Sequence, residues 1–114
     1  MTQGFSCKNN HYHYATTNTG PGHAHTYNGS VPAVSGIIGN EWFDKISNKV
    51  VYVVDDSTVT TVGDGDAKAG QMSPRNMLVS TICDQLKLSN HFQSKTIGIA
   101  IKDRGSILPV GHTA

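Results

Sequence analysis

The chain has 114 residues, the size of one small domain, and its 37% hydrophobic content is enough for a core and too high for a disordered polar chain. Nine Lys and Arg stand against eight Asp and Glu without a run of like charge, which excludes the electrostatic pattern of a nucleic-acid polymer or membrane-surface binder. No apolar stretch reaches the roughly 18 residues of a membrane span, and the first residues do not resemble a signal peptide. Small phosphate-bearing substrates remain compatible with this charge balance.

The N-terminal region changes pattern near residue 17. Between Gly4 and Thr17, Tyr12 and Tyr14 alternate with histidines, which is the period of a strand. Pro21 is then well placed in the first turn of a helix that runs toward Tyr27 and stops at Asn28-Gly29.

The region from Gly36 to Asp56 predicts a hairpin. Trp42-Phe43 precede a turn at Ser47-Asn48, and the apolar run Val50–Val54 follows it. The continuous apolar character of this run predicts a second strand that is buried on both faces.

The second half of the chain predicts a loop, a helix and a strand. The segment 61–70 is rich in Gly and Asp, Ser73 and Pro74 suit the N-cap and N1 positions of a helix that ends near Ser89-Asn90, and 95–101 is a short apolar strand. A strand, helix and strand in this order indicate a crossover unit. The expected fold class is therefore α/β, with a mostly parallel sheet flanked by helices.

Cysteines and histidines give weaker signals. Cys7 and Cys83 lack metal-binding or redox spacing, so two unpaired thiols are favoured over a bridge between them. Four of the six histidines fall between residues 11 and 25, but His23 and His25 would project about 200° apart on a helix. Structural or surface histidines are therefore favoured over a metal site in this segment. The loop Gly63–Asp66 lacks calcium-hand spacing and is expected to be a solvated turn.

The most informative residues lie at predicted element ends. Thr19 begins a helix, where backbone N–H groups and the helix dipole favour an anion. Asn40 follows a glycine-rich strand end, and Lys102 with Arg104 follow the last strand, where both can face one phosphoryl group. These residues suggest phosphoryl chemistry, but their types alone fit an ordinary helix start and a solvated turn better. The common P-loop, GxSxG, HExxH and GxGxxG motifs are absent from the sequence.

A family resemblance favours the chemical interpretation. The sequence resembles the alkaline phosphatase superfamily, in the branch of type I phosphodiesterases/nucleotide pyrophosphatases and phosphate-irrepressible alkaline phosphatases. The similarity runs from Gly4 to Ala114, is closest to the second group, and is carried by Thr16–His23, Gly29, Pro32, Gly36–Asp44, Ser73–Asn76, Ile99–Gly105 and Gly111–Ala114. The sequence departs from the family pattern at Asn28, where Thr is usual, and at Ser35, where His is frequent.

The resemblance implies a role for each candidate residue. Thr19 would be the nucleophile and a ligand of one of two zinc ions, and Asn40 would donate to a phosphoryl oxygen. Lys102 and Arg104 match the pair that recognises a phosphate monoester, which the diesterase branch is not expected to carry. The implied fold is a three-layer α/β sandwich, and the implied reaction is monoester hydrolysis through a phospho-threonine intermediate.

The resemblance also sets the expected context of the chain. Residues 1–114 would be a partial, truncated catalytic domain, the nucleophile and phosphate-recognition segment of a periplasmic or secreted hydrolase, with most zinc ligands elsewhere in the parent protein. Small phosphate esters are the expected partners. The alternatives are a phosphodiesterase or nucleotide pyrophosphatase of the same superfamily and a non-catalytic phosphate-binding module.

Overall fold

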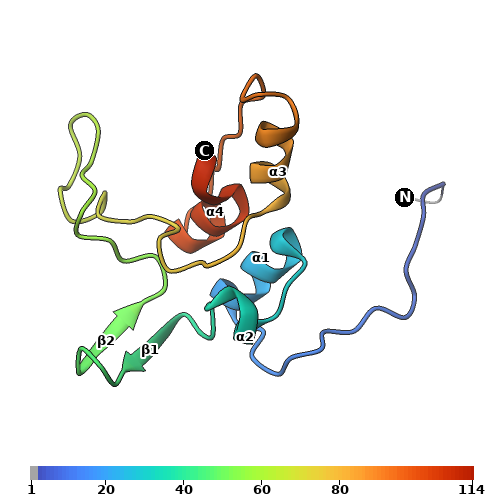
Figure 1. Ribbon diagram of the computed structural model, residues 1–114, viewed down its shortest axis with the longest axis horizontal. Helices are drawn as coiled ribbons and strands as arrows, with labels where there is room; N and C mark the ends of the chain where they lie inside the picture. Colours follow the sequence, from blue (N-terminus) through green and yellow to red (C-terminus); the bar gives the residue numbers. More distant parts are fainter. Residues whose placement is uncertain (1–2) are drawn as a thin grey trace.

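The computed structural model describes residues 3–114, which form four α-helices, a short 3₁₀ helix and a two-stranded sheet (Figure 1). The elements in chain order are α1 (Thr19–Asn28), α2 (Pro32–Ser35), β1 (Glu41–Asp44), β2 (Lys49–Tyr52), α3 (Ile82–Ser89), α4 (Asp103–Val110) and η1 (Gly111–Thr113). Within the described residues, no helix has the length and apolar character that crossing a membrane requires.

Helix α1 forms where the sequence predicts it. Asn18 has extended backbone angles just before the helix, and Pro21 lies in the first turn, where its missing N–H costs nothing. Gly29 adopts the left-handed conformation with φ 65°, and its N–H donates to the carbonyl of His25 at 3.0 Å. These residues therefore set both ends of the helix that begins at Thr19.

The predicted hairpin is also confirmed. β1 pairs with β2 in antiparallel register from Glu41 opposite Tyr52 to Asp44 opposite Lys49. Asp44 closes the turn by accepting hydrogen bonds from the backbone N–H groups of Ile46 and Ser47. The expected burial of the second strand on both faces is wrong, because Val50 is 65% exposed and burial begins only at Val53, just past β2.

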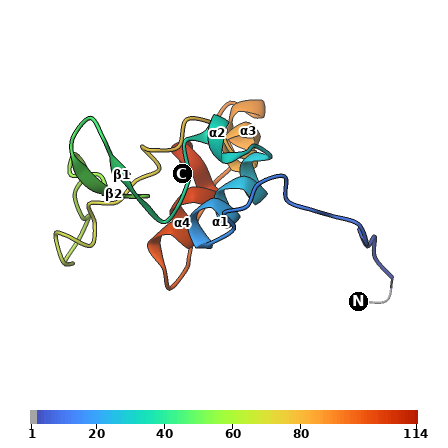
Figure 2. The same cartoon turned by 90° about the horizontal axis from the view of Figure 1, so that it is seen from below.

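A small core lies between the helices and the base of the hairpin. Its buried apolar residues are Ala24, Ile37, Val53, Val54, Met77 and Leu108. Figure 2 shows α1 and α4 side by side, with α2 and α3 on the same side of the molecule and the hairpin projecting away. The radius of gyration is 15.5 Å, above the about 13 Å of a compact chain of this length. The extended N-terminal segment and the projecting hairpin account for the difference.

Three predicted elements differ in the structure. Residues 4–17 are irregular and not a strand, since they have no neighbouring strand to pair with. The second long helix begins at Ile82, because Ser73 uses its hydroxyl in a turn, accepting from Arg75 N and donating to Asp56. The segment 95–101 is not a strand, and its Ile97, Ile99 and Ile101 are 78%, 92% and 105% exposed. The described residues therefore contain no parallel strand pair.

Asp84 ties the start of α3 to the C-terminal turn. One carboxylate oxygen accepts from the backbone N–H and hydroxyl of Thr81, and the other accepts from the N–H and hydroxyl of Thr113. Asp84 is 2% exposed, and Gly111 allows this approach because a Cβ there would collide with the carboxylate. Burial raises the pKa of Asp84, but the hydrogen bonds from Thr81 and Thr113 outweigh it, so the pKa is lowered.

Replacing Asp84 by asparagine is expected to destabilise the chain by about 2 kcal/mol, because an amide leaves buried N–H donors unsatisfied. Since the folded-state pKa of Asp84 lies below its unfolded value of about 3.9, its stabilisation is present above that pH and is lost as the pH falls through the folded pKa. Denaturant unfolding at pH 7 and pH 3 measures both effects. The control is Asp66→Asn, which removes an exposed carboxylate that also accepts two backbone N–H bonds. Equal losses in the two variants would contradict this role of Asp84.

Candidate active site

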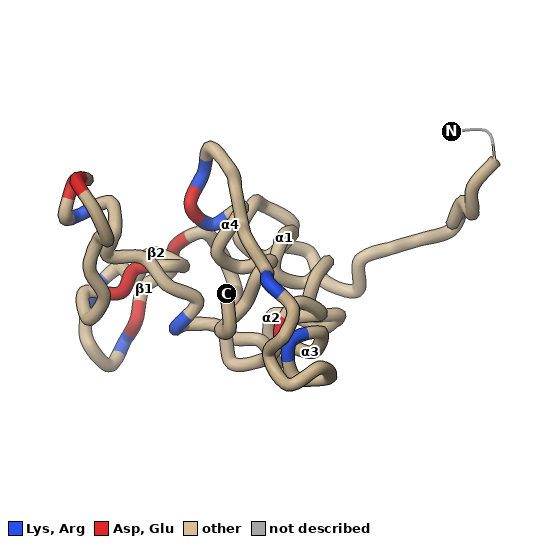
Figure 3. The backbone as a smooth tube through the Cα atoms, turned by 90° about the horizontal axis from the view of Figure 1, so that it is seen from above, with Lys and Arg blue, Asp and Glu red and all other residues tan. Residues whose placement is uncertain are grey.

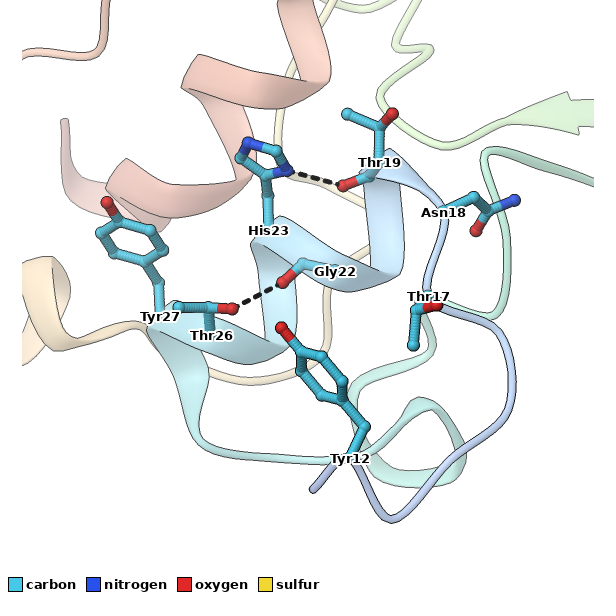
Figure 4. A pocket seen from close by; sticks show the side chains of 8 residues that line it. All are labelled: Tyr12, Thr17, Asn18, Thr19, Gly22, His23, Thr26 and Tyr27. Carbon is cyan, nitrogen blue, oxygen red and sulfur yellow. Dashed lines mark hydrogen bonds between the residues drawn. The ribbon is translucent and has the colours of Figure 1, made fainter. Parts of the chain in front are cut away.

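Thr19 stands at the mouth of a pocket of about 600 Å³ at the N-terminus of α1 (Figure 4). The pocket is lined by Tyr12, Thr17, Asn18, Thr19, Gly22, His23, Thr26 and Tyr27. Few donors remain free at this helix start, because Gly22 N bonds to Asn18 O, Gly20 N is occupied and Pro21 has no N–H. In the first turn, the N–H of Thr19 has no acceptor within the described residues. The helix start therefore offers fewer free backbone donors to an anion than the sequence predicts.

Asn40 reaches the same helix start from an irregular segment. The expected strand end before Asn40 is wrong, because residues 36–40 pair with no strand and β1 begins only at Glu41. Its Oδ1 accepts from Gly20 N at 2.7 Å, and a Cβ at Gly20 would lie 3.1 Å from that oxygen, so the approach favours glycine. Since the carbonyl side of the amide is used in this way, the Nδ2 donors project from the other side. The structure therefore ties Asn40 to the residue that follows Thr19, and the donors of the Asn40 amide have no protein partner in the described residues.

Lys102 and Arg104 line a second pocket, of about 360 Å³, at the start of α4. Lys102 is exposed at the N-cap position, whereas Arg104 is half-buried against the end of β2. The Arg104 guanidinium donates from Nη1 to the Tyr52 hydroxyl at 2.6 Å and lies 5.6 Å from the centre of the Tyr52 ring. Figure 3 shows basic and acidic positions close together where the chain enters α4, and both kinds of charge interspersed elsewhere. The predicted pair thus shares one pocket.

The two pockets have no lining residue in common, so the structure does not place all four predicted residues around one cavity. The base of the hairpin lies between the two pockets. There the Asn40 carbonyl accepts a hydrogen bond from Val53 N at 2.9 Å, and Val53 follows Tyr52, which lines the second pocket. The two pockets are also connected through His23, which lines the first pocket and lies near Gly105 of α4.

The structure adds residues that the sequence patterns did not indicate. His23 lies one turn after Thr19, and its Nδ1 is 3.0 Å from the Thr19 carbonyl oxygen, where it can donate a hydrogen bond. Buried His25 and Ser35 are paired, with Nε2 and Oγ 2.6 Å apart, and burial lowers the pKa of His25. Ser35, one of the departures from the family pattern, thus holds the far end of α1 against α2. The signal for His23 was its helical i, i+4 spacing from Thr19.

The described residues do not make a zinc site by themselves. No group of three or more His, Cys, Asp or Glu side chains in residues 3–114 is placed to hold a metal ion. Thr19 can contribute one hydroxyl oxygen to such an ion, so the two-zinc site expected from the resemblance requires ligands from outside these residues. Cys7 and Cys83 are both unpaired, as predicted.

Comparison with known proteins identifies the family. The model of the family described as type I phosphodiesterase / nucleotide pyrophosphatase matches residues 1–103, most of the chain. The chain belongs to this family. The predicted superfamily is therefore confirmed.

Named relatives of this family cover the whole chain. A calcium-transporting ATPase of Myroides odoratus is 53% identical over 114 residues, and the alkaline phosphatase PhoV of Synechococcus elongatus is 50% identical over 114 residues. Both alignments cover 100% of this chain, but 21% and 20% of the relatives. The chain thus spans about a fifth of the length of these proteins.

Solved structures confirm the fold class. The crystal structure of wild-type alkaline phosphatase PafA matches 87% of this chain and 19% of its own chain, with a TM-score of 0.84 and 48% identity. PafA from Elizabethkingia meningoseptica is also similar in sequence, with 46% identity over 112 residues. A second matching structure, at TM-score 0.84, is a PafA variant in which one threonine is changed to serine and one asparagine, one lysine and one arginine to alanine. The chain has part of the alkaline-phosphatase-like α/β fold.

Proposed function

We propose that this chain is the nucleophile and phosphate-recognition segment of a zinc-dependent phosphate-monoester hydrolase that acts through a phospho-threonine intermediate. The observation that carries the proposal is the hydrogen bond from Gly20 N to Asn40 Oδ1. This bond ties the Asn40 amide to the first turn of the helix that Thr19 begins, and the N-terminus of a helix suits an anionic phosphoryl group. Export to the periplasm or the medium is part of the proposal through the family resemblance.

The PafA variant supports the choice of residues. Its substituted threonine, asparagine, lysine and arginine are separated by 21, 62 and 2 positions along the PafA chain, and the same separations hold here for Thr19, Asn40, Lys102 and Arg104. Four residue types at identical separations, in a chain 44% identical to that variant, support the assignment of this set as the reactive residues.

Each residue has a chemical part in the proposed reaction. The Thr19 hydroxyl loses its proton and its oxygen bonds to phosphorus, while the bond to the ester oxygen breaks and that oxygen takes up a proton and leaves as the alcohol. Water then attacks the phospho-threonine, which frees phosphate and restores the hydroxyl. The Asn40 amide donates to a phosphoryl oxygen, and Lys102 and Arg104 balance the charge of the transferred group. Zinc, when bound, would make the hydroxyl more acidic; its other ligands lie outside these residues.

Lys102 and Arg104 favour monoesters over diesters in this proposal. A monoester has one more unsubstituted, negatively charged oxygen than a diester, and two cations in one pocket match that charge. The competing functions are a phosphodiesterase, an ATP hydrolase and a module that binds phosphate without catalysis.

A chimera tests the function. Residues 1–114 replace the matching segment of PafA, and the product is assayed with an aryl phosphate, a diaryl phosphate and ATP. The proposal expects the aryl monoester to have the highest kcat/KM. A preference for the diester or ATP would support those alternatives, and phosphate binding without turnover in a folded chimera would support the binding module.

The 114-residue chain alone is expected to have no phosphatase activity, even with added zinc. A threonine hydroxyl without a metal or an adjacent base is a poor nucleophile at neutral pH. Release of an aryl alcohol above the buffer rate is the measurement. Turnover by the isolated chain that Thr19→Ala abolishes would show that these residues form a complete active site.

A further inference from the structure

Tyr52, Asp103 and Arg104 form a chain of hydrogen bonds between β2 and α4. Arg104 Nη1 donates to the Tyr52 hydroxyl at 2.6 Å, and this hydroxyl donates to Asp103 Oδ1 at 2.7 Å. The same carboxylate oxygen accepts from the backbone N–H of Arg104 at 2.6 Å. The Tyr52 hydroxyl therefore acts as a donor and as an acceptor at once, and it links the Asp103 carboxylate to the Arg104 guanidinium.

These contacts determine which nitrogens of the Arg104 guanidinium have a hydrogen-bond partner inside the protein. Nη1 is bound to Tyr52, and the ring of Tyr52 lies against the guanidinium. Nε of Arg104 is buried and has no hydrogen-bond partner in the described residues. Nε and Nη2 form one of the two edges that bind a phosphate in a forked manner. This edge has no hydrogen-bond partner within the described residues, and Arg104 lines the pocket at the start of α4.

Burial raises the pKa of Tyr52, and donation to Asp103 raises it further against the opposing effect of Arg104. The hydroxyl therefore stays protonated at neutral pH. It can donate to Asp103 and accept from Arg104 at the same time, which an ionised phenolate could not do.

We propose that Tyr52 is a positioning residue that orients the free edge of the Arg104 guanidinium toward a phosphoryl oxygen, with Asp103 holding the Tyr52 hydroxyl. This inference rests on the proposed function of Arg104 in phosphate recognition. It predicts that Tyr52 affects monoester hydrolysis through Arg104 and not through the nucleophile. A purely structural Tyr52, which packs the hairpin base on α4, would instead affect both substrate classes and folding.

The first test observes Arg104 directly in the full chain. The chain contains two arginines, so the ¹⁵N-resolved Nε–H signals are assigned with Arg75→Lys and Arg104→Lys. Tyr52→Phe keeps the ring and removes only the hydroxyl. The exchange of the Arg104 Nε–H with water is expected to be about tenfold faster in Tyr52→Phe, the effect of losing one hydrogen bond to a charged group. Equal exchange rates in the two proteins would overturn the proposal.

The second test measures coupling in the PafA chimera. Tyr52→Phe is expected to lower kcat/KM for an aryl monoester about tenfold, and to change that for a diester less than about threefold. In an Arg104→Ala background, Tyr52→Phe is expected to have no further effect on the monoester. Additive losses, or equal losses on monoester and diester, would contradict positioning through Arg104.

The two tests separate the inference from the function on which it rests. If added inorganic phosphate leaves the Arg104 signal unchanged, phosphate recognition by Arg104 fails. The exchange rates of the Nε–H still decide whether Tyr52 orients the guanidinium.

Discussion

Replacing Thr19 by alanine in the PafA chimera should lower kcat/KM for both monoester and diester by several powers of ten, up to the roughly 10⁶-fold loss that follows removal of a covalent nucleophile. The loss is expected for both substrates because the oxygen that attacks phosphorus is the same. Thr19→Ser keeps a hydroxyl at the first position of α1 and should retain activity within about tenfold, since only a methyl group is lost. Initial rates over a range of substrate concentrations give these values.

The matched control is Thr16→Ala, the same substitution at an exposed threonine that precedes the helix and does not line the pocket. It should leave kcat/KM unchanged. If Thr19→Ala kept more than about a tenth of the activity, Thr19 would be a helix-start residue and not the nucleophile.

The double variant Lys102→Ala, Arg104→Ala should lose monoester kcat/KM by about two to four powers of ten and diester kcat/KM far less. Charge-assisted hydrogen bonds contribute about 1.5 to 3 kcal/mol each, so two reach roughly 3 to 6 kcal/mol if they strengthen in the transition state. The diester lacks the additional charged oxygen that this pair would bind.

A second double variant, Lys45→Ala, Lys49→Ala, removes the same charge from two exposed lysines at the tip of the hairpin. It should leave both rates within about threefold, because exposed charges far from the phosphoryl group are screened. Equal losses on monoester and diester in the Lys102, Arg104 variant would indicate a folding defect and contradict selective recognition.

Local signals in the sequence were sufficient for α1 and the hairpin. Pro21 and Gly29 mark the first turn and the end of α1 by backbone chemistry alone, and the structure has both where predicted. The hairpin turn at Ser47-Asn48 is likewise confirmed, with Asn48 at φ 55°.

The start of α3 shows where local signals compete. Ser73 followed by Pro74 resembles a helix start, but a second start at Thr81 satisfies its own donors through a capping box with Asp84. The Ser73 hydroxyl instead donates to Asp56, 17 residues away. Because that contact depends on the folded loop, the sequence pattern could not distinguish the two starts.

The sequence indicated where some candidate site residues lie, but not how they contact one another. Glycines around Asn40 and the helix start at Thr19 pointed to chemistry at element ends, and the structure brings these two segments together. Tyr52 was not predictable, because an aromatic residue in an apolar strand is typical of a core. Its contacts with Asp103 and Arg104 join residues 51 and 52 positions apart, which only the folded chain reveals.

The most direct test of the central claim is to trap the intermediate on Thr19. The chimera is mixed with an aryl phosphate, quenched in acid during turnover, digested and analysed by mass spectrometry for a phosphoryl group on the peptide that contains Thr19. The proposed mechanism predicts phospho-threonine at this residue, formed at a rate at least equal to kcat and absent from Thr19→Ala. An active chimera whose Thr19 peptide stays unmodified at every quench time, or whose phosphoryl group is found on another residue, would contradict it.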